Sequence, residues 1–301
     1  MKSTLTKKNK IGLGTAQFGL DYGLSNPGGR VPEQEVRKIL HTAWNSGVNL
    51  LDTAAAYGTS EEVLGKTIEP DYRFQIVTKV PSIPSELGAN EVETFIRRTF
   101  ERSLRRLRTN SVYSLMFHNA DDLLSETGNE AYATLRALKD EGFIEKIGVS
   151  AYTQAQLEAV ARRFDYDLVQ VPINALDQRL MQSAYLTELH DKGVEIHARS
   201  VFLQGLLLQP PDELDSYFDP VRSKLREFHA EDKRHGATPL KLALTYVNGI
   251  DTISQVVIGV TRETELREVL DTVREPISAE FEQFAVNDEA IINPALWPAK
   301  L

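Results

Sequence analysis

An aspartate, a tyrosine, a lysine and a histidine stand at the ends of three successive apolar segments of this chain. Asp52 and Tyr57 follow the segment 47–51, Lys79 ends the next one and His118 ends the third. Ligands bind at the carboxyl ends of strands in α/β proteins, so we expect these side chains to face one site. A carboxylate, a phenol, an ammonium group and an imidazole around one oxygen atom could move a proton to or from it.

Carbonyl reduction by hydride needs such a proton, because negative charge develops on the carbonyl oxygen. A tyrosine has an ordinary pKa of about 10 and is a poor acid near neutral pH. A neighbouring ammonium group such as Lys79 would favour the phenolate, and Asp52 could hold Lys79 in place and charged. The order of residues in the chain does not separate Tyr57 from His118 as the proton donor.

The same residues resemble the signature of the aldo-keto reductase family. The motif is Asp-x-Ala-x-x-Tyr-Gly-x-Ser-Glu at 52–61, followed by Leu-Gly at 64–65, and Lys79 and His118 match in order and setting. The resemblance runs from about residue 11 to about residue 270. It implies an enzyme that reduces an aldehyde or ketone with NAD(P)H. Asp52, Tyr57, Lys79 and His118 would be catalytic, and Tyr57 would be the proton donor.

Each of these four residues also has a purely structural interpretation. Asp52 could cap a helix, Tyr57 could pack in a turn, and Lys79 or His118 could be solvated at the rim. Two other functions stay open. One is a nicotinamide-binding regulatory subunit with little turnover, and the other is a barrel lyase that uses Lys79 as a Schiff base.

The cofactor must bind without a dinucleotide fingerprint. Gly12 and Gly14 begin such a pattern, but Gln17 stands at the third glycine position and we expect a loop, not a helix, through Arg30. The segment 257–266 offers an alternative phosphate site after a strand. It resembles the adenosine-phosphate loop of the family, and Arg262 favours NADP(H) over NAD(H).

Other cofactor contacts are implied by the resemblance. Ser150 and Gln170 match positions that hold the nicotinamide carboxamide, and the segment 200–205 resembles a pyrophosphate-binding loop. The complete predicted set is Gly14, Thr15, Asp52, Ser150, Gln170, Arg199, Ser200, Leu203, Gly205, Gly259, Thr261, Arg262 and Glu265.

Three departures from the family pattern concern this set. Ala151 replaces an amide, Glu265 and Val269 replace amides at the adenosine end, and Arg199 replaces an aromatic ring stacked on the nicotinamide. Glu265 would repel a 2′-phosphate, so NAD(H) stays an alternative. We hypothesise that Arg199 is paired with a carboxylate or with an anionic substrate.

The substrate pocket is expected from a few aromatic and polar residues near the same mouth. Phe18 and Tyr22 could line it, whereas Trp44 fits the core face of a helix. A hydroxylated substrate such as a sugar would suit the polar residues Asp21, Asn119, Asp121 and Asp122.

Strand and helix patterns alternate about eight times, which predicts a parallel sheet and, at this length, a single (β/α)8 TIM barrel; an open doubly wound sheet is the alternative. Ser60 is expected to cap the helix after Tyr57. We expect one domain over residues 1–301, with a loop and helix insertion at about 200–238, a C-terminal helical tail near 279–285, and a polar lead at 2–10 that could form half a hairpin. The expected strands are 11–15, 47–52, 74–79, 112–118, 144–150, 168–172, 194–199 and 256–258, and the expected helices are 32–46, 60–67, 91–107, 129–141, 153–163, 183–192, 220–234, 239–248 and 264–272.

The bulk composition excludes several classes of function. A net charge of −9 argues against a nucleic-acid or anionic-membrane surface, and the chain has no cysteine for a disulfide, a thiolate nucleophile or a cysteine metal site. Neither a signal peptide nor an apolar run of about 20 residues is found, so a cytoplasmic location is expected. No metal-ligand spacing occurs. The expected partner is a small-molecule carbonyl substrate, and the oligomeric state is not predicted.

Overall fold

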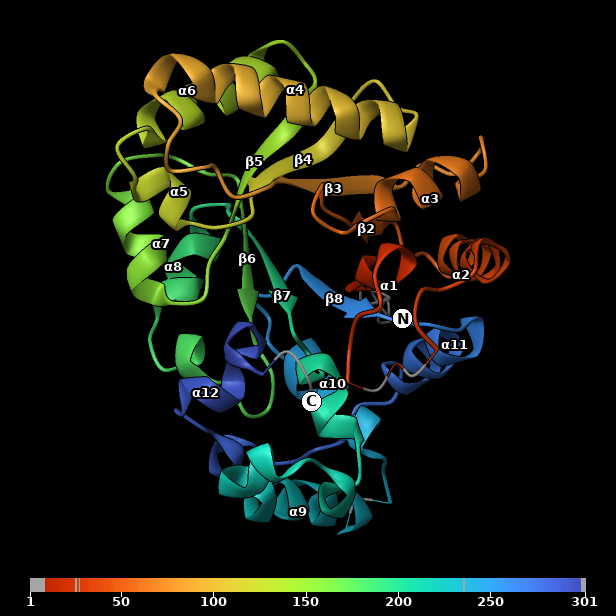
Figure 1. The fold of residues 1–301 in the computed structure, drawn as a ribbon. Helices are drawn as coiled ribbons and strands as arrows, with labels where there is room; N and C mark the ends of the chain where they lie inside the picture. Colours follow the sequence, from red (N-terminus) through yellow and green to blue (C-terminus); the bar gives the residue numbers. More distant parts are fainter. Residues whose placement is uncertain (1–8, 25, 27, 235, 299–301) are drawn as a thin grey trace, which may run out of the picture.

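A closed barrel of eight parallel strands forms the centre of the molecule (Figure 1). The structure is a computed structural model that describes residues 9–24, 26, 28–234 and 236–298. Each strand pairs with the next one along the chain, and the last pairs with the first. The barrel prediction is therefore confirmed, and the open sheet is excluded. The strands are β1 Ile11–Gly14, β2 Leu50–Asp52, β3 Gln75–Val80, β4 Val112–Phe117, β5 Ile144–Ser150, β6 Leu168–Pro172, β7 Glu195–Arg199 and β8 Gln255–Gly259.

Helices surround the barrel (Figure 1), and the side chains that they bury are mainly apolar. In α2 (Glu33–Asn45), Val36, Ile39 and Leu40 are fully buried. Trp44, expected on that face, is instead partly exposed, because it stacks on Tyr72 with ring centroids 5.4 Å apart. The outer helices are α2 Glu33–Asn45, α3 Ser60–Thr67, α4 Ala89–Leu107, α6 Gly128–Asp140, α7 Gln154–Ala161, α8 Tyr185–Asp191, α10 Pro239–Asn248 and α11 Glu263–Thr272.

Two single-turn helices lie in the loops that follow strands. They are α1 Ala16–Gly19, after β1, and α5 Asp121–Leu124, after β4. The expectation of a plain loop from Thr15 to Arg30 was therefore wrong over α1. One turn of helix has no periodicity that a sequence pattern could reveal, and its position depends on what it packs against.

The segment between β7 and α10 adds a second apolar cluster outside the barrel. It contains α9 Asp219–Arg234, close to the predicted helix, which Figure 1 shows at the lower edge of the molecule. Phe228 of α9 packs edge-on against Phe284, with ring centroids 5.3 Å apart. The insertion and the C-terminal segment thus bury each other's apolar side chains.

The tail helix predicted near 279–285 was wrong. Only the 3₁₀ turn Glu282–Phe284 forms there, followed by α12 Glu289–Ile292. The backbone N–H of Val286 donates to the carbonyl of Leu176 at 2.9 Å, which ties the segment to a distant part of the chain. The polar lead expected at 2–10 falls largely outside the described residues, and the domain extent of 1–301 stays a prediction.

The barrel interior has an apolar middle between two polar ends. Leu50, Val77, Met116, Leu168 and Val257 form a buried cluster there. Among the described helices, none is both long and apolar enough to cross a membrane. The polar carboxyl ends of the strands are where the predicted site residues gather.

Candidate active site

A buried ion pair joins the ends of β2 and β3. The Lys79 Nζ donates to both carboxylate oxygens of Asp52, at 2.7 and 2.8 Å, and to the carbonyl of Thr53 at 3.0 Å. Gln170 of β6 donates its amide N–H to the same carboxylate at 2.7 Å. Burial acts to lower the pKa of Lys79, but the adjacent Asp52 carboxylate more than offsets this and the pKa is raised. Lys79 is therefore an ammonium ion at neutral pH.

Tyr57 and His118 lie beside this ion pair. The Lys79 Nζ is 5.1 Å from the centre of the Tyr57 ring, and the His118 ring meets the Tyr57 ring edge-on with centroids 5.7 Å apart. Burial, together with the charge of Lys79, lowers the pKa of His118 to about 4. His118 is therefore neutral at pH 7. The structure brings together all four residues that the sequence singled out.

The turn that carries Tyr57 packs directly against α1. A Cβ atom added at Gly19 would lie 2.0 Å from the carbonyl oxygen of Tyr57, and one at Gly58 would lie 2.4 Å from the carbonyl oxygen of Gly19. Gly58 also has a φ of +54°, which a side chain would make unfavourable. These glycines therefore let the two backbone segments pack in direct contact, which fixes the position of the turn that carries Tyr57.

Ser60 anchors this turn to β1 and does not cap α3, contrary to expectation. The N-cap residue is Thr59. The Ser60 hydroxyl donates to the carbonyl of Thr15 at 2.8 Å, and its oxygen lies 3.1 Å from the hydroxyl oxygen of Thr53. A serine at a helix start can cap the helix or form a hydrogen bond to a neighbouring segment. Here the position of β1 decides between the two.

A cavity of about 670 Å³ opens at the carboxyl ends of the strands. Tyr57 and His118 line it, whereas Lys79 is buried behind Asp52. Every predicted cofactor residue lines the cavity except Leu203 and Arg262. Leu203 is fully buried in the second apolar cluster, and the exposed Arg262 sits at the N-cap of α11.

The cavity wall after β7 has an unusual backbone. Ser200, Leu203 and Gln204 have positive φ angles of 57°, 48° and 55°, and they are three of the four non-glycine residues with positive φ in the described parts of the chain. Each such conformation costs on the order of 1–3 kcal/mol. Strain of this kind persists where the surrounding structure enforces it, and here it shapes a cavity wall.

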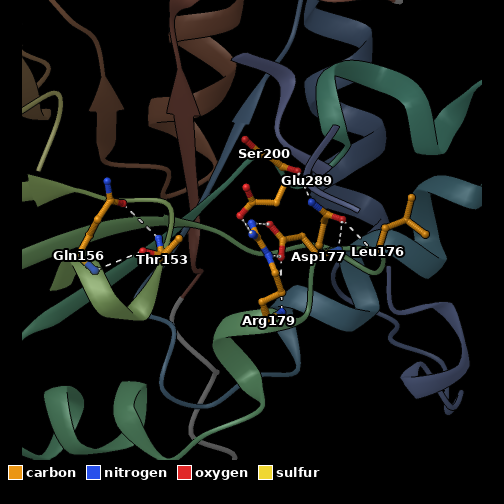
Figure 2. A network of polar contacts seen from close by, with 8 residues as sticks. Thr153, Gln156, Leu176, Asp177, Arg179, Ser200 and Glu289 are labelled. Carbon is orange, nitrogen blue, oxygen red and sulfur yellow. Dashed lines mark hydrogen bonds and ion pairs between the residues drawn. The ribbon is translucent and has the colours of Figure 1, made fainter. Parts of the chain in front are cut away.

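A network of hydrogen bonds and ion pairs supports this strained segment. Asn174 donates its amide N–H to the carbonyl of Ser200 at 3.1 Å and accepts from the backbone N–H of Asp177 at 2.9 Å. Asp177 is in turn bound by Arg179, which also pairs with Glu289 at 2.8 Å. Figure 2 draws Ser200, Asp177, Arg179 and Glu289 in one view, with dashed lines for the hydrogen bonds and ion pairs of the network. The loop after β6 and the C-terminal segment therefore both support the cavity wall.

The far end of the cavity is acidic. The Glu265 carboxylate accepts from the backbone N–H of Thr261 at 2.7 Å, from its hydroxyl at 3.0 Å and from the backbone N–H of Arg262 at 3.3 Å. Glu268 lines the same end. Glu265 thus occupies the N–H groups of the two residues before α11, and Glu35 occupies the N–H of the first residue of the helix. Helix N-termini commonly bind phosphate, but carboxylates take these N–H groups here.

Comparison with known proteins identifies the family. The sequence model of the aldo/keto reductase family matches residues 10–289. The chain belongs to this family. It is therefore an oxidoreductase that acts on carbonyl or alcohol groups with a nicotinamide cofactor, as the resemblance implied.

Individual relatives of this aldo/keto reductase are distant. L-galactose dehydrogenase of Arabidopsis thaliana is 27% identical over 99% of this chain and 95% of its own length. D-threo-aldose 1-dehydrogenase of Pseudomonas sp is 25% identical over 87% of this chain and 91% of its own.

Solved structures with the same fold include two proteins of low sequence identity. Aldo-keto reductase AKR11C1 of Bacillus halodurans, in its holo form, has a TM-score of 0.72 at 20% identity and covers 91% of this chain and 90% of its own. Glycerol dehydrogenase AKR11B4 of Gluconobacter oxydans has a TM-score of 0.69 at 22% identity, covering 90% and 88%. At these identities the two structures show the shared barrel fold.

The cavity of this reductase suits an extended nicotinamide coenzyme. One end holds Tyr57 and His118, the other holds Thr261 and Glu265, and the strained wall lies between them. A Cβ added at Gly259 would come within 2.5 Å of the side chain of Gln17, so this glycine lets Gln17 pack closely against the end of β8. The volume is in the usual range for cofactor sites.

Several cavity residues were missed by the sequence analysis. Gln17 is on α1, Gln204 is in the strained segment, and Tyr152 and Glu268 lie beyond the ends of β5 and β8. The predicted residues stand mostly at strand ends, whereas these side chains reach the cavity from loops and helices. Only the aromatic ring of Tyr152, two residues after the predicted Ser150, offered a signal.

The proposed substrate-mouth residues are only partly in place. Tyr22 lines the cavity, whereas Phe18 and the polar residues Asp21, Asn119, Asp121 and Asp122 do not. Asp21 accepts from the backbone N–H of Arg30 at 2.9 Å and so closes its own loop. The chemistry of the substrate site must therefore come from other side chains.

Proposed function

We propose that this reductase transfers a hydride between a nicotinamide coenzyme and the carbonyl carbon of an aldehyde or ketone, with Tyr57 as the proton donor to the oxygen. The observation that carries the proposal is the buried Lys79–Asp52 pair, whose ammonium group lies beside the Tyr57 ring at the head of the cavity. A charged ammonium group there stabilises the phenolate that proton transfer would leave behind.

The chemistry divides among the four residues. When bound, the nicotinamide supplies or accepts the hydride. Tyr57 gives its hydroxyl proton to the carbonyl oxygen as the new C–H bond forms, and takes it back when an alcohol is oxidised. Asp52 keeps Lys79 fixed and charged. Because His118 is neutral near pH 7, it can donate one N–H to the carbonyl oxygen but is not a proton source, which supports Tyr57 as the acid.

The lyase alternative is disfavoured by the state of Lys79. A Schiff base forms from a neutral amine that can reach the substrate carbonyl. Here burial with Asp52 keeps Lys79 charged, its side chain is 1% exposed, and it does not line the cavity. The regulatory alternative has no observation in its favour, because the four residues needed for turnover lie together.

A hydroxylated carbonyl compound, such as a sugar, is the proposed substrate. The support comes from the names of two relatives, an L-galactose dehydrogenase and a D-threo-aldose 1-dehydrogenase, each aligned over most of this chain. The polar residues expected at the mouth give no support, since they lie outside the cavity.

The preferred coenzyme is the finer part of this proposal. Arg262 was the reason to expect NADP(H), but its side chain does not line the cavity. Glu265 occupies the N–H groups of Thr261 and Arg262, just before α11, and Glu268 lines the same cavity. Two carboxylates would repel a 2′-phosphate but could accept hydrogen bonds from ribose hydroxyls. This geometry supports NAD(H) as the preferred coenzyme.

Turnover tests the proposal directly. Consumption of NADH and of NADPH is measured against a panel of aldoses and simple aldehydes. Tyr57→Phe is expected to lower kcat by about 10²- to 10⁴-fold, because it removes the proton donor. Tyr132→Phe, a change on α6 outside the cavity, serves as the matched control. Tight NADH binding without turnover of any carbonyl would instead identify a regulatory protein.

The same assay tests the coenzyme preference. The wild type is expected to use NADH better than NADPH. Glu265→Gln removes one negative charge, so it should shift the NADH to NADPH ratio of kcat/KM toward NADPH by about tenfold, which corresponds to about 1.4 kcal/mol. Glu275→Gln, an exposed change beyond α11, should leave the ratio as it is. A wild type that favours NADPH would overturn the NAD(H) proposal.

A further inference from the structure

Arg199 places a guanidinium group in the cavity near the reaction centre. It ends β7 and lines the same cavity as Tyr57 and His118. The guanidinium carbon lies 4.3 Å from the centre of the Tyr152 ring. The one hydrogen bond of the guanidinium group to the described parts of the chain goes to the Ser200 hydroxyl at 3.3 Å. A guanidinium stacked on an aromatic ring is held flat while its edge stays available to a ligand.

This positive charge has no carboxylate partner among the residues that the structure describes. Within the described ranges, Arg199 forms no ion pair, whereas Lys79 is neutralised by Asp52 and His118 is uncharged. The carboxylates that line the cavity near α11, those of Glu265 and Glu268, belong to its far end. The part of the cavity around Tyr57 therefore carries one uncompensated cation, and such a site attracts anions.

The guanidinium group lies close enough to the reaction centre for its charge to act on Lys79 and His118. Tyr152, on which it stacks, follows β5, and β5 pairs with β4, whose end carries His118. The positive charge of Arg199 also contributes to the low pKa of His118. β8 and α11, which bound the acidic end, lie on the opposite side of β7.

We propose that Arg199 binds an anionic group of the substrate, so that the preferred substrates are carbonyl compounds, or the matching alcohols, that carry a carboxylate or a phosphate. The proposal rests on the proposed function, whose hydroxylated substrate it makes more specific: a sugar acid or a sugar phosphate has both features. The planar fork of guanidinium suits the paired oxygens of either anion. It also reassigns Arg199, which the sequence analysis placed among the cofactor residues.

Matched pairs of substrates test this reassignment. Succinic semialdehyde is compared with butanal for the carboxylate, and glyceraldehyde 3-phosphate with glyceraldehyde for the phosphate. The wild type should prefer the anionic member of at least one pair by at least about tenfold in kcat/KM, since charged hydrogen bonds contribute about 1.5–3 kcal/mol. The pair that shows the preference identifies which anion the site takes.

Substitutions at Arg199 show whether it is the origin of that preference. Arg199→Met should bring the anionic to neutral ratio close to one, and Arg199→Lys should keep part of it, because the charge stays but the fork is lost. Arg105→Met, an exposed change on α4, is the matched control and should keep the wild-type ratio. The dissociation constant of NADH is measured for each variant, to separate an effect on coenzyme from an effect on substrate.

Two results would overturn the proposal. One is a wild-type ratio near one in both pairs, and the other is an Arg199→Met variant that keeps the ratio but binds NADH more weakly. Calorimetric titration of succinate into the NADH complex covers the case in which none of the four aldehydes turns over. Succinate binding that weakens at least about tenfold in Arg199→Met would then support the anion site although the proposed reaction had failed. Equal succinate binding by both proteins would refute it.

Discussion

The two ends of the barrel hold clusters with matching chemical groups, and only one has the arrangement of an active site. Each has a carboxylate, a lysine, a tyrosine and a histidine. We call them the carboxyl-end cluster, with Asp52, Lys79, Tyr57 and His118, and the amino-end cluster, with Glu195, Lys146, Tyr113 and His197. Only the first borders the large cavity.

The clusters differ in whether the tyrosine hydroxyl donates a hydrogen bond to a carboxylate. In the amino-end cluster, Tyr113 donates its hydroxyl to Glu195 at 2.7 Å, and Lys146 binds the same carboxylate oxygen at 2.7 Å. Burial and this hydrogen bond raise the pKa of Tyr113, so it is a worse acid than usual. In the carboxyl-end cluster, Lys79 and Gln170 bind the carboxylate of Asp52.

Tyr57, in contrast, lines the cavity and makes no hydrogen bond through its hydroxyl to the described parts of the chain. Its proton is thus available to a ligand, whereas that of Tyr113 is held by Glu195. Residue types alone therefore do not define an active site. The acceptor for the tyrosine proton and access to a cavity decide the function.

The largest expected difference between the clusters is in the effect of losing the lysine. Lys79→Met should lower kcat by about 10²- to 10⁴-fold, because the phenolate of Tyr57 loses its stabilising charge. Lys146→Met should change kcat by less than about threefold. Steady-state rates with the best aldehyde of the panel measure both.

The buried charge of Asp52 complicates this experiment. Removing one partner of a buried ion pair costs about 3–5 kcal/mol of stability, so Lys79→Met could fail to fold. The double variant Asp52→Asn, Lys79→Met removes both charges and should fold with the same loss of turnover. If Lys146→Met lost as much turnover as Lys79→Met, the two clusters would not differ in their role in the reaction.

The clusters should respond to acid in different pH ranges. Burial and Lys79 lower the pKa of His118 to about 4 from its ordinary 6.5, so the unfolded chain binds this proton first and stability falls as the pH drops from 6.5 toward 4. Burial acts to raise the pKa of Glu195, but the contacts with His197, Lys146 and Tyr113 lower it to about 2. Its stabilising contribution is present above pH 4.5 and is lost as the pH falls through 2.

Unfolding free energies across this pH range would separate the two contributions. His118→Asn should flatten the decline between pH 6.5 and 4, and Glu195→Gln should flatten the decline below pH 4.5. Urea titrations at a series of pH values measure both slopes. A His118→Asn variant with the wild-type slope over the upper range would show that this histidine is not held neutral.

The smallest expected effect is a loss of stability in the amino-end cluster. Tyr113→Phe removes one hydrogen bond to a charged group, so the free energy of unfolding should fall by about 1.5–3 kcal/mol while turnover stays at the wild-type level. Urea denaturation together with the aldehyde assay tests this. A large loss of turnover would mean that the amino-end cluster takes part in the reaction.

Much of the fold was predictable from the sequence. The strands at 144–150 and 168–172 and the helices at 60–67 and 239–248 have the predicted bounds, because short apolar runs and amphipathic periods mark them clearly. The single-turn helices α1 and α5 and the tail after residue 275 were not predictable. They form only where distant segments, such as Leu176 for Val286, offer a hydrogen-bond partner.

The sequence predicted which residues belong to the candidate site better than it predicted their contacts. Strand ends located Asp52, Lys79 and His118, since parallel strands place these ends at one edge. Leu203 and Arg262 were assigned to the cavity by analogy, yet neither lines it. Leu203 is buried in the second apolar cluster, and Arg262 is exposed at the N-cap of α11.

The sequence by itself determined which ionisable side chains reach the carboxyl ends of the strands, because the alternation of apolar segments and polar ends is local. Only the tertiary structure decided which charges are compensated. Asp52 receives hydrogen bonds from Lys79 and from Gln170, which lies 118 residues away, whereas Arg199 meets an aromatic ring and no carboxylate in the parts of the chain that are described. The physical reason is that barrel closure chooses the neighbours of a buried charge, and those neighbours fix its protonation and the ligand that it can bind.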